Sequence, residues 1–170
     1  MSTFAKWFRT GVDADFDHFL GLEDYHLQLM GLVKISGTLG NVTGKRVFLP
    51  GVFFESRTKH PFVEQQTRMT AVDMQYAGIV QDQATYHVPA NFAVESAPTD
   101  TSIPWTGKAV FQLKSKVDGN KIDVVRSMSR GFTILKPDDY KALHEFYQKV
   151  ATADQQQLVL TSATKASGGN

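Results

Sequence analysis

The sequence predicts a mainly β protein, an antiparallel β-sandwich with one principal C-terminal helix followed by a short final strand. Seven or more short apolar or alternating segments follow one another closely and are punctuated by glycine and proline, as in antiparallel all-β domains. Convincing helical spacing of apolar residues is found in one place, after Pro137. With 170 residues and 42% hydrophobic content, the chain can bury roughly 70% of its unfolded surface as one domain.

The predicted strands begin with an alternating segment. From Val12 to Asp17, apolar residues alternate with aspartates at the period of two that a half-buried strand requires. Further strands are predicted where apolar runs are bounded or interrupted by glycine and proline, at residues 27–35, 46–54, 67–74, 79–88 and 109–117.

A tight hairpin is predicted at Asp118-Gly119-Asn120. Asp-Gly and Gly-Asn pairs are favoured in tight hairpin turns because they tolerate the positive φ that these turns demand. Residues 121–129 are therefore expected to form the returning strand.

The principal helix is predicted to start within a few residues of Pro137. Proline has a fixed φ suited to the first helical turn, and Asp138 and Asp139 place negative charge against the free N–H groups there. A buried stripe then recurs at helical spacing, at Tyr140, Leu143, Phe146, Tyr147 and Val150. After it, the apolar run at residues 158–160 predicts a strand that joins an existing sheet.

These signals together predict a single domain at residues 1–161. An aromatic-rich segment follows directly on Met1, so residues 1–11 are expected to be the remnant of a connection to an upstream domain. Residues 162–170 are expected to form a disordered tail.

Composition excludes several classes of function. Eighteen basic and seventeen acidic residues give a formal charge of +1, which leaves no broad field to attract nucleic acid. No segment approaches the ~20 apolar residues of a membrane helix, so no membrane insertion is expected. The chain contains no cysteine, and it therefore has no thiol nucleophile, thiolate metal ligand or disulfide.

The segment from Gly40 to Arg46 has only a superficial likeness to a phosphate-binding loop. A P-loop needs four residues between its glycines and a serine or threonine after its lysine, whereas here three residues separate Gly40 from Gly44 and Arg46 follows Lys45. The segment is predicted to be a hairpin loop.

Asp13, Asp15, Asp17 and Asp24 have the spacing of a calcium-binding loop. However, His18 occupies the position where such loops need glycine, and neither flank is helical. In a strand, alternate carboxylates are roughly 7 Å apart, too far to share one ion. The sequence therefore predicts an acidic, solvated strand face and no metal site.

No catalytic residue and no cofactor site is predicted. The five histidines share no ligand spacing. Ser127 and Ser129 precede Gly131, but the leading glycine of a nucleophile elbow is missing.

Three aromatic residues are candidate contacts for a partner, namely Trp7, Phe8 and Trp105. Pro104 and Gly107 place Trp105 in a predicted loop. Aromatic side chains on a β-sandwich can bind a sugar or a protein, although most of them belong to the core.

Residues 47–160 resemble the C-terminal domain of bacterial transglutaminase-like proteins, in which domains of unknown function flank a papain-like core. The resemblance rests on Pro61-Phe62, on Arg68 soon after them, and on residues 71–76, 88–96, 135–147 and 153–160. The resemblance implies an accessory β-sandwich attached to an enzyme, in a protein of the bacterial cell envelope or in an exported protein. The full-length protein would therefore be periplasmic or exported. The resemblance transfers no catalytic residue, since the family's cysteine, histidine and aspartate would lie upstream.

The sequence analysis thus favours a non-catalytic accessory or structural domain that associates with a transglutaminase-like catalytic core of the same polypeptide. The alternative is a glycan- or peptide-binding module that uses exposed aromatic residues such as Trp105. An independent hydrolase with scattered carboxylates is the third and weakest hypothesis.

Overall fold

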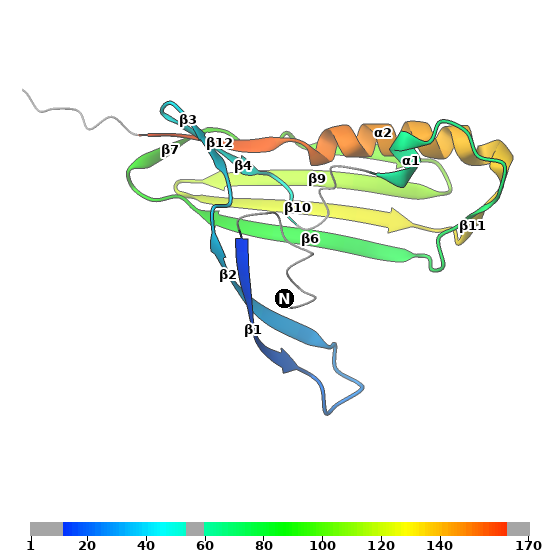
Figure 1. Cartoon of the computed structure of the whole chain (residues 1–170), viewed down its shortest axis with the longest axis horizontal. Coiled ribbons are helices and arrows are strands. Elements are labelled where there is room, and N and C mark those ends of the chain that lie inside the picture. The colour runs from blue at the N-terminus through cyan, green and yellow to red at the C-terminus, as the bar shows by residue number, and fades with distance from the viewer. Residues whose placement is uncertain (1–11, 54–59, 163–170) are drawn as a thin grey trace, which may run out of the picture. The chain divides into compact units, whose positions relative to one another are not determined.

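The computed structural model describes residues 12–53 and 60–162 of the chain. It confirms the predicted fold class, because most elements are antiparallel strands and one main helix precedes a final strand (Figure 1). The chain separates into two compact units, with the boundary between Asn41 and Val42. The single domain expected at residues 1–161 stays a prediction.

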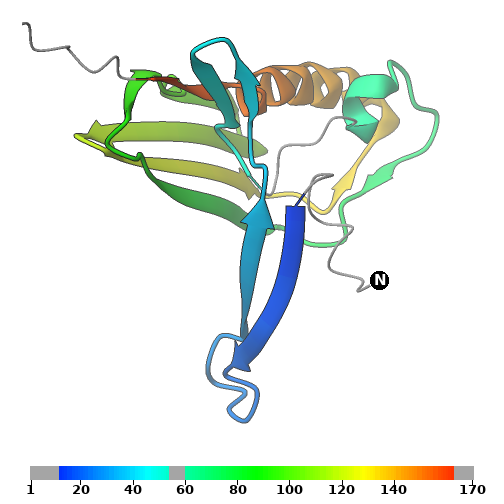
Figure 2. The same ribbon diagram turned by 60° about the vertical axis from the view of Figure 1, so that its left-hand side comes forward.

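The described residues of the first unit form a β-hairpin. Strands β1 (Val12–Leu20) and β2 (Met30–Gly37) pair antiparallel and lie side by side (Figure 2). The strand predicted at residues 27–35 is present, but it begins at Met30 and ends at Gly37. Between Phe16 and His18 the register shifts, so that Asp17 is an extra, bulged residue. The predicted strict alternation consequently ends at Phe16.

The bulge changes which side chains share a face of the hairpin. Phe16 pairs with Val33 and Phe19 with Gly31, so both phenylalanines lie on one face although they are three residues apart. Their ring centroids are 4.5 Å apart. A Cβ at Gly31 would lie 3.2 Å from the Phe19 ring, so glycine leaves room for this pair.

The second unit contains two four-stranded antiparallel sheets. The first has the order β6 (Gly78–His87), β10 (Lys121–Arg130), β9 (Ala109–Asp118) and β8 (Thr101–Trp105). The second has the order β3 (Asn41–Thr43), β4 (Arg46–Pro50), β12 (Gln157–Ser162) and β7 (Phe92–Ser96). Strands β5 (Val72–Asp73) and β11 (Ile134–Leu135) form a short separate pair.

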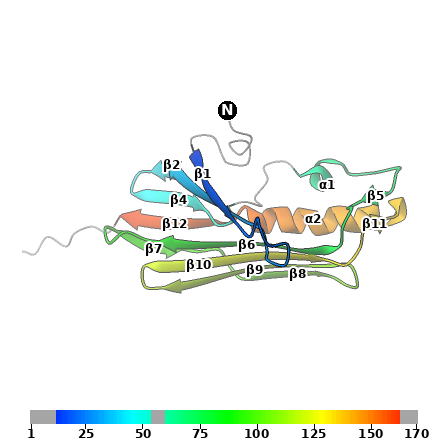
Figure 3. The same cartoon turned by 90° about the horizontal axis from the view of Figure 1, so that it is seen from below.

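Helix α2 (Tyr140–Asp154) follows a 3₁₀ turn, η2 (Pro137–Asp139), and all five residues of its predicted apolar stripe are buried. Figure 3 shows α2 continuing along the line of β12, so the helix and the second sheet share one layer over the first sheet. The core lies between these layers, where Phe111, Leu113 and Ile122 of the first sheet are fully buried together with Leu143 and Leu158. The short helix α1 (Pro61–Glu64) contacts α2.

Both predicted hairpin turns are confirmed. Gly119 has φ +58° between β9 and β10, and Gly44 has φ +61° between β3 and β4. The final strand is confirmed as well, because β12 pairs with both β4 and β7.

The predicted strand at residues 67–74 is wrong for most of its length. Only Val72 and Asp73 are in a strand, and their partner β11 is two residues long. Met69 is 93% exposed, so its apolar side chain has no buried face to join. The prediction also missed β7 and β8, whose sequences are short and interrupted by polar residues or proline.

Candidate functional site

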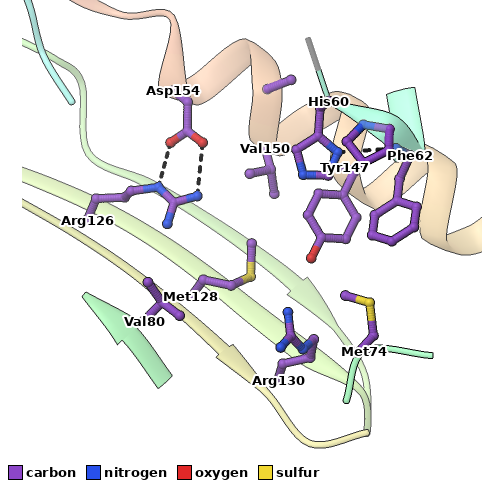
Figure 4. A pocket seen from close by; sticks show the side chains of 12 residues that line it. His60, Phe62, Met74, Val80, Arg126, Met128, Arg130, Tyr147, Val150 and Asp154 are labelled. Carbon is purple, nitrogen blue, oxygen red and sulfur yellow. Dashed lines mark hydrogen bonds and ion pairs between the residues drawn. The ribbon is translucent and has the colours of Figure 1, made fainter. Parts of the chain in front are cut away.

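A pocket of about 290 Å³ lies between β10 and α2 in the second unit. On β10, Arg126, Met128 and Arg130 project to the same side because strand side chains alternate. On α2, Tyr147, Val150, Ala151 and Asp154 share one face at helical spacing. The remaining lining residues are His60, Pro61, Phe62, Met74 and Val80 (Figure 4).

A bidentate ion pair forms one end of this pocket. Arg126 donates from Nε to Asp154 Oδ1 at 2.8 Å and from Nη2 to Oδ2 at 2.9 Å (Figure 4). The two residues are only 5% and 7% exposed, so this contact joins the sheet to the helix inside the core. The Arg126 guanidinium also lies 5.2 Å from the centroid of the Phe111 ring.

Arg130 lines the opposite end of the pocket, next to Met74 and Met128 (Figure 4). Its Nη2 donates to the carbonyl oxygen of Tyr76 at 3.0 Å. Its Nε is buried and has no hydrogen-bond partner among the described residues. Buried donors are nearly always paired in folded proteins, so this guanidinium is an exception that calls for an explanation.

Stacked rings form the wall beside α1. His60 caps α1, accepting a hydrogen bond on Nδ1 from the Phe62 amide at 3.3 Å, and its ring stacks on Tyr147 with centroids 4.4 Å apart. Phe62 packs on Tyr147 at 5.1 Å. His144 Nδ1 donates to the Phe62 carbonyl oxygen at 2.7 Å, which ties α1 to α2. The wall is therefore held by both hydrogen bonds and ring packing.

A second pocket, of about 430 Å³, lies between β8 and the C-terminal part of α2. Its lining contains one charged side chain, Lys149, and otherwise consists of small, apolar or amide residues such as Thr152 and Gln156. Gln156 Nε2 already donates to Thr101 Oγ1 at 3.4 Å, and no charged pair or buried unpaired donor lies among these lining residues. The smaller pocket, where two guanidiniums meet an apolar wall, is the better candidate site.

The three aromatic residues proposed from the sequence have different outcomes. Trp7 and Phe8 lie outside the described residues. Trp105 is the last residue of β8 and not a loop residue, which corrects its predicted setting. It is half-buried and packs against Phe132 and Phe146, with ring centroids at 5.5 and 5.6 Å. Its contact with a partner stays a prediction.

The acidic row at Asp13, Asp15 and Asp17 lies on β1, as predicted, and the three residues are exposed. Across residues 12–53 and 60–162, no three histidine, aspartate or glutamate side chains come together in a group that could hold a metal ion. Asp17, at the bulge, instead contacts His18, with 3.1 Å between Oδ2 and Nδ1.

Sequence reasoning missed Arg126, Arg130 and Asp154. The two arginines belong to a predicted strand, but Asp154 is 28 residues away from Arg126 in the sequence. The only available signal was that the predicted strand carries two arginines on its apolar face. Arg126 and Arg130 lie on the same face as Met128, one on either side of it.

Comparison with known proteins identifies one family. The model of DUF3858, a domain of unknown function with a solved structure, matches residues 45–160. No curated protein matches the chain. Among solved structures, a "putative protease" from Parabacteroides distasonis ATCC 8503 has 13% sequence identity and a TM-score of 0.49, over 57% of this chain. The chain covers 19% of the length of that protein.

No helix in the described part of the chain is long and apolar enough to cross a membrane.

Proposed function

We propose that this chain, which belongs to the DUF3858 family of domains of unknown function, is a non-catalytic accessory domain that associates with a transglutaminase-like catalytic core of the same polypeptide. The sequence resemblance of residues 47–160 motivates the choice of partner. The lack of cysteine in the sequence means that a thiol nucleophile for acyl transfer would have to come from another domain. By the same resemblance, the full-length protein is periplasmic or exported.

The observation that carries this proposal is the apolar surface of the β1–β2 hairpin. At its tip, Leu22 is 66% exposed, Tyr25 90% and Leu27 61%. A hairpin of two strands is at best marginally stable in water, and an exposed apolar surface of this kind is typical of a protein contact. The hairpin also precedes residue 45, where the family match begins.

The hairpin tip has a defined shape. Asp24 accepts hydrogen bonds from the His26 amide on Oδ1 at 2.9 Å and from the Leu27 amide on its carbonyl oxygen at 3.0 Å. Gly21 has φ +79°, and a Cβ there would lie 2.8 Å from the Gln28 carbonyl oxygen. These contacts define the local conformation of the turn, which reduces the conformational entropy that the tip loses when it docks on a partner.

Co-purification tests the proposal. The chain is co-expressed with a separately encoded transglutaminase-like core from the same reading frame, and the tagged core is captured. We expect the wild-type chain to be retained, and Leu22→Asp and Tyr25→Asp to be lost from the complex because a buried carboxylate is costly. Ile79→Asp is the matched control, since Ile79 is 72% exposed in the second unit, on the first sheet.

Three results would overturn the accessory role. These are failure of the wild-type chain to associate, retention of both hairpin variants, and transamidation or peptide hydrolysis by the isolated chain. A reading frame without a Cys-His-Asp domain upstream would remove the proposed partner.

The second candidate function is a ligand-binding module, and the pocket between β10 and α2 favours it. The sequence analysis proposed a glycan or a peptide as the ligand. The pocket is lined by methionine, valine and aromatic side chains around two arginines, which fits an apolar peptide group better than a sugar. Retention of the chain on a peptide array but not on a glycan array would support this function.

A further inference from the structure

We infer that the pocket between β10 and α2 binds the carboxylate of a small ligand with an apolar body, such as the C-terminal residue of a peptide, and that Arg130 is its anchor. This inference rests on the second candidate function, the binding module. It does not depend on docking through the β1–β2 hairpin.

Charge is unbalanced in the pocket. The lining includes two guanidiniums, Arg126 and Arg130, but Asp154 is its only acidic side chain among the described residues. Asp154 uses both carboxylate oxygens to bind Arg126. Arg130 is therefore left without an opposite charge from the lining, and a bound anion would supply one.

The hydrogen bonding of Arg130 leads to the same conclusion. One of its nitrogens donates to the Tyr76 carbonyl oxygen, while its Nε is shielded from water and has no acceptor among the described residues. The residue as a whole is half-buried, so a ligand can reach part of it. A carboxylate in the pocket would accept this missing hydrogen bond in the geometry that arginine favours.

The walls define the rest of the ligand. Met74, Met128, Val80 and Val150 provide flexible or branched apolar surface, and Tyr147 adds an aromatic ring. A sugar acid would leave its hydroxyls unpaired against these side chains. A phosphate would place its remaining charged oxygens against the same apolar side chains. An apolar carboxylate therefore fits best.

Size and access fit a small group. The volume of about 290 Å³ is near the lower end of ligand pockets, which span roughly 300 to 1,000 Å³. Val80, on the edge strand β6, lines the pocket and is 44% exposed, so the pocket reaches the surface there.

Calorimetry with defined probes tests the inference. N-acetyl-leucine is titrated into the full chain beside its neutral counterpart N-acetyl-leucinamide, the sugar acid glucuronate, and inorganic phosphate. We expect saturable binding of N-acetyl-leucine alone, with a dissociation constant that rises with salt. Arg130→Gln should weaken binding at least tenfold, whereas Arg46→Gln, which removes an exposed arginine of β4 outside the pocket, should leave it unchanged.

A second variant guards against a folding defect in Arg130→Gln. Val80→Phe enlarges an exposed side chain at the pocket and should block N-acetyl-leucine by filling the space. Equal binding of the amide, equal or tighter binding of glucuronate or phosphate, undiminished binding by Arg130→Gln, or no binding of any probe would each overturn the inference. The Arg130→Gln variant should still co-purify with the catalytic core. Calorimetry therefore tests the pocket separately, and co-purification tests the accessory role.

Discussion

Arg126 and Asp154 join the first sheet to α2 through two parallel hydrogen bonds, 2.8 and 2.9 Å long, in a setting where neither residue is more than 7% exposed. Removal of one partner of such a pair leaves a buried charge without compensation. We expect Asp154→Ala to lower the free energy of unfolding by about 3 to 5 kcal/mol, measured by urea denaturation. The double variant Arg126→Met, Asp154→Leu should recover most of this loss.

The chain contains a matched control for this prediction. Arg46 and Glu95 form the same bidentate contact between β4 and β7, at 2.7 and 2.6 Å, but their side chains are 57% and 34% exposed. Water screens exposed pairs and competes for their hydrogen bonds. Glu95→Gln should therefore leave the urea midpoint almost unchanged. If Asp154→Ala and Glu95→Gln lowered the free energy of unfolding equally, burial of the ion pair would not explain the loss.

Leu143→Ala should destabilise the second unit by about 2 to 4 kcal/mol. Leu143 is fully buried on the face of α2 that packs on the first sheet, so truncation removes apolar contacts and leaves a cavity. Lys141→Ala, at an exposed position of the same helix, is the control. If Leu143→Ala had the melting temperature of the wild type, the side chain of Leu143 would not contribute to the packing of the core.

Local signals explain why much of the second unit was predictable. The turn at Gly119 and the helical stripe from Tyr140 to Val150 are each encoded within a few adjacent residues. Chain connectivity then brings β9 and β10 together as the predicted hairpin, because a two-residue turn leaves little freedom in their register.

The candidate site could not be predicted because it depends on contacts between distant residues. Asp154 meets Arg126 only after α2 has packed on the sheet, and Tyr76 meets Arg130 across 54 residues. The bulge at Asp17 and the lack of a strand at residues 67–71 were also unpredictable, because both depend on how a segment pairs with a distant partner. Alternation or β propensity in one segment does not reveal whether a partner strand is present.

Gly119→Ala should destabilise the protein by about 1 kcal/mol, because the turn requires a φ of +58° that alanine adopts only with strain. Space is not the reason, since nothing lies within 4 Å of a Cβ placed there. Gly78→Ala is the control, at a position with equal space but without a positive φ. Denaturant unfolding of both variants measures the difference, and equal midpoints would contradict the turn conformation.

Asp123 should give the stability of the fold only a weak dependence on acid pH, because its contacts are exposed and screened by water. Hydrogen bonds from Lys121 Nζ at 2.9 Å and from Thr85 Oγ1 at 2.7 Å hold the pKa of Asp123 below its ordinary value of 3.8. A depressed folded pKa stabilises the protein above the unfolded pKa, and this contribution is lost as the pH falls through the folded pKa. In an NMR titration, Lys121→Gln should raise the pKa of the Asp123 carboxyl. An unchanged value would exclude Lys121 as the main cause.

We expect the chain to dock on a catalytic domain through the apolar β1–β2 hairpin. Amide hydrogen exchange of the full chain, recorded with and without the transglutaminase-like core, tests it most directly. We expect added protection in residues 12–37, greatest at the tip around Leu22 and Tyr25, with little change in β9 and β10. Unchanged exchange across the hairpin in the presence of saturating core, or protection confined to the second unit, would contradict it.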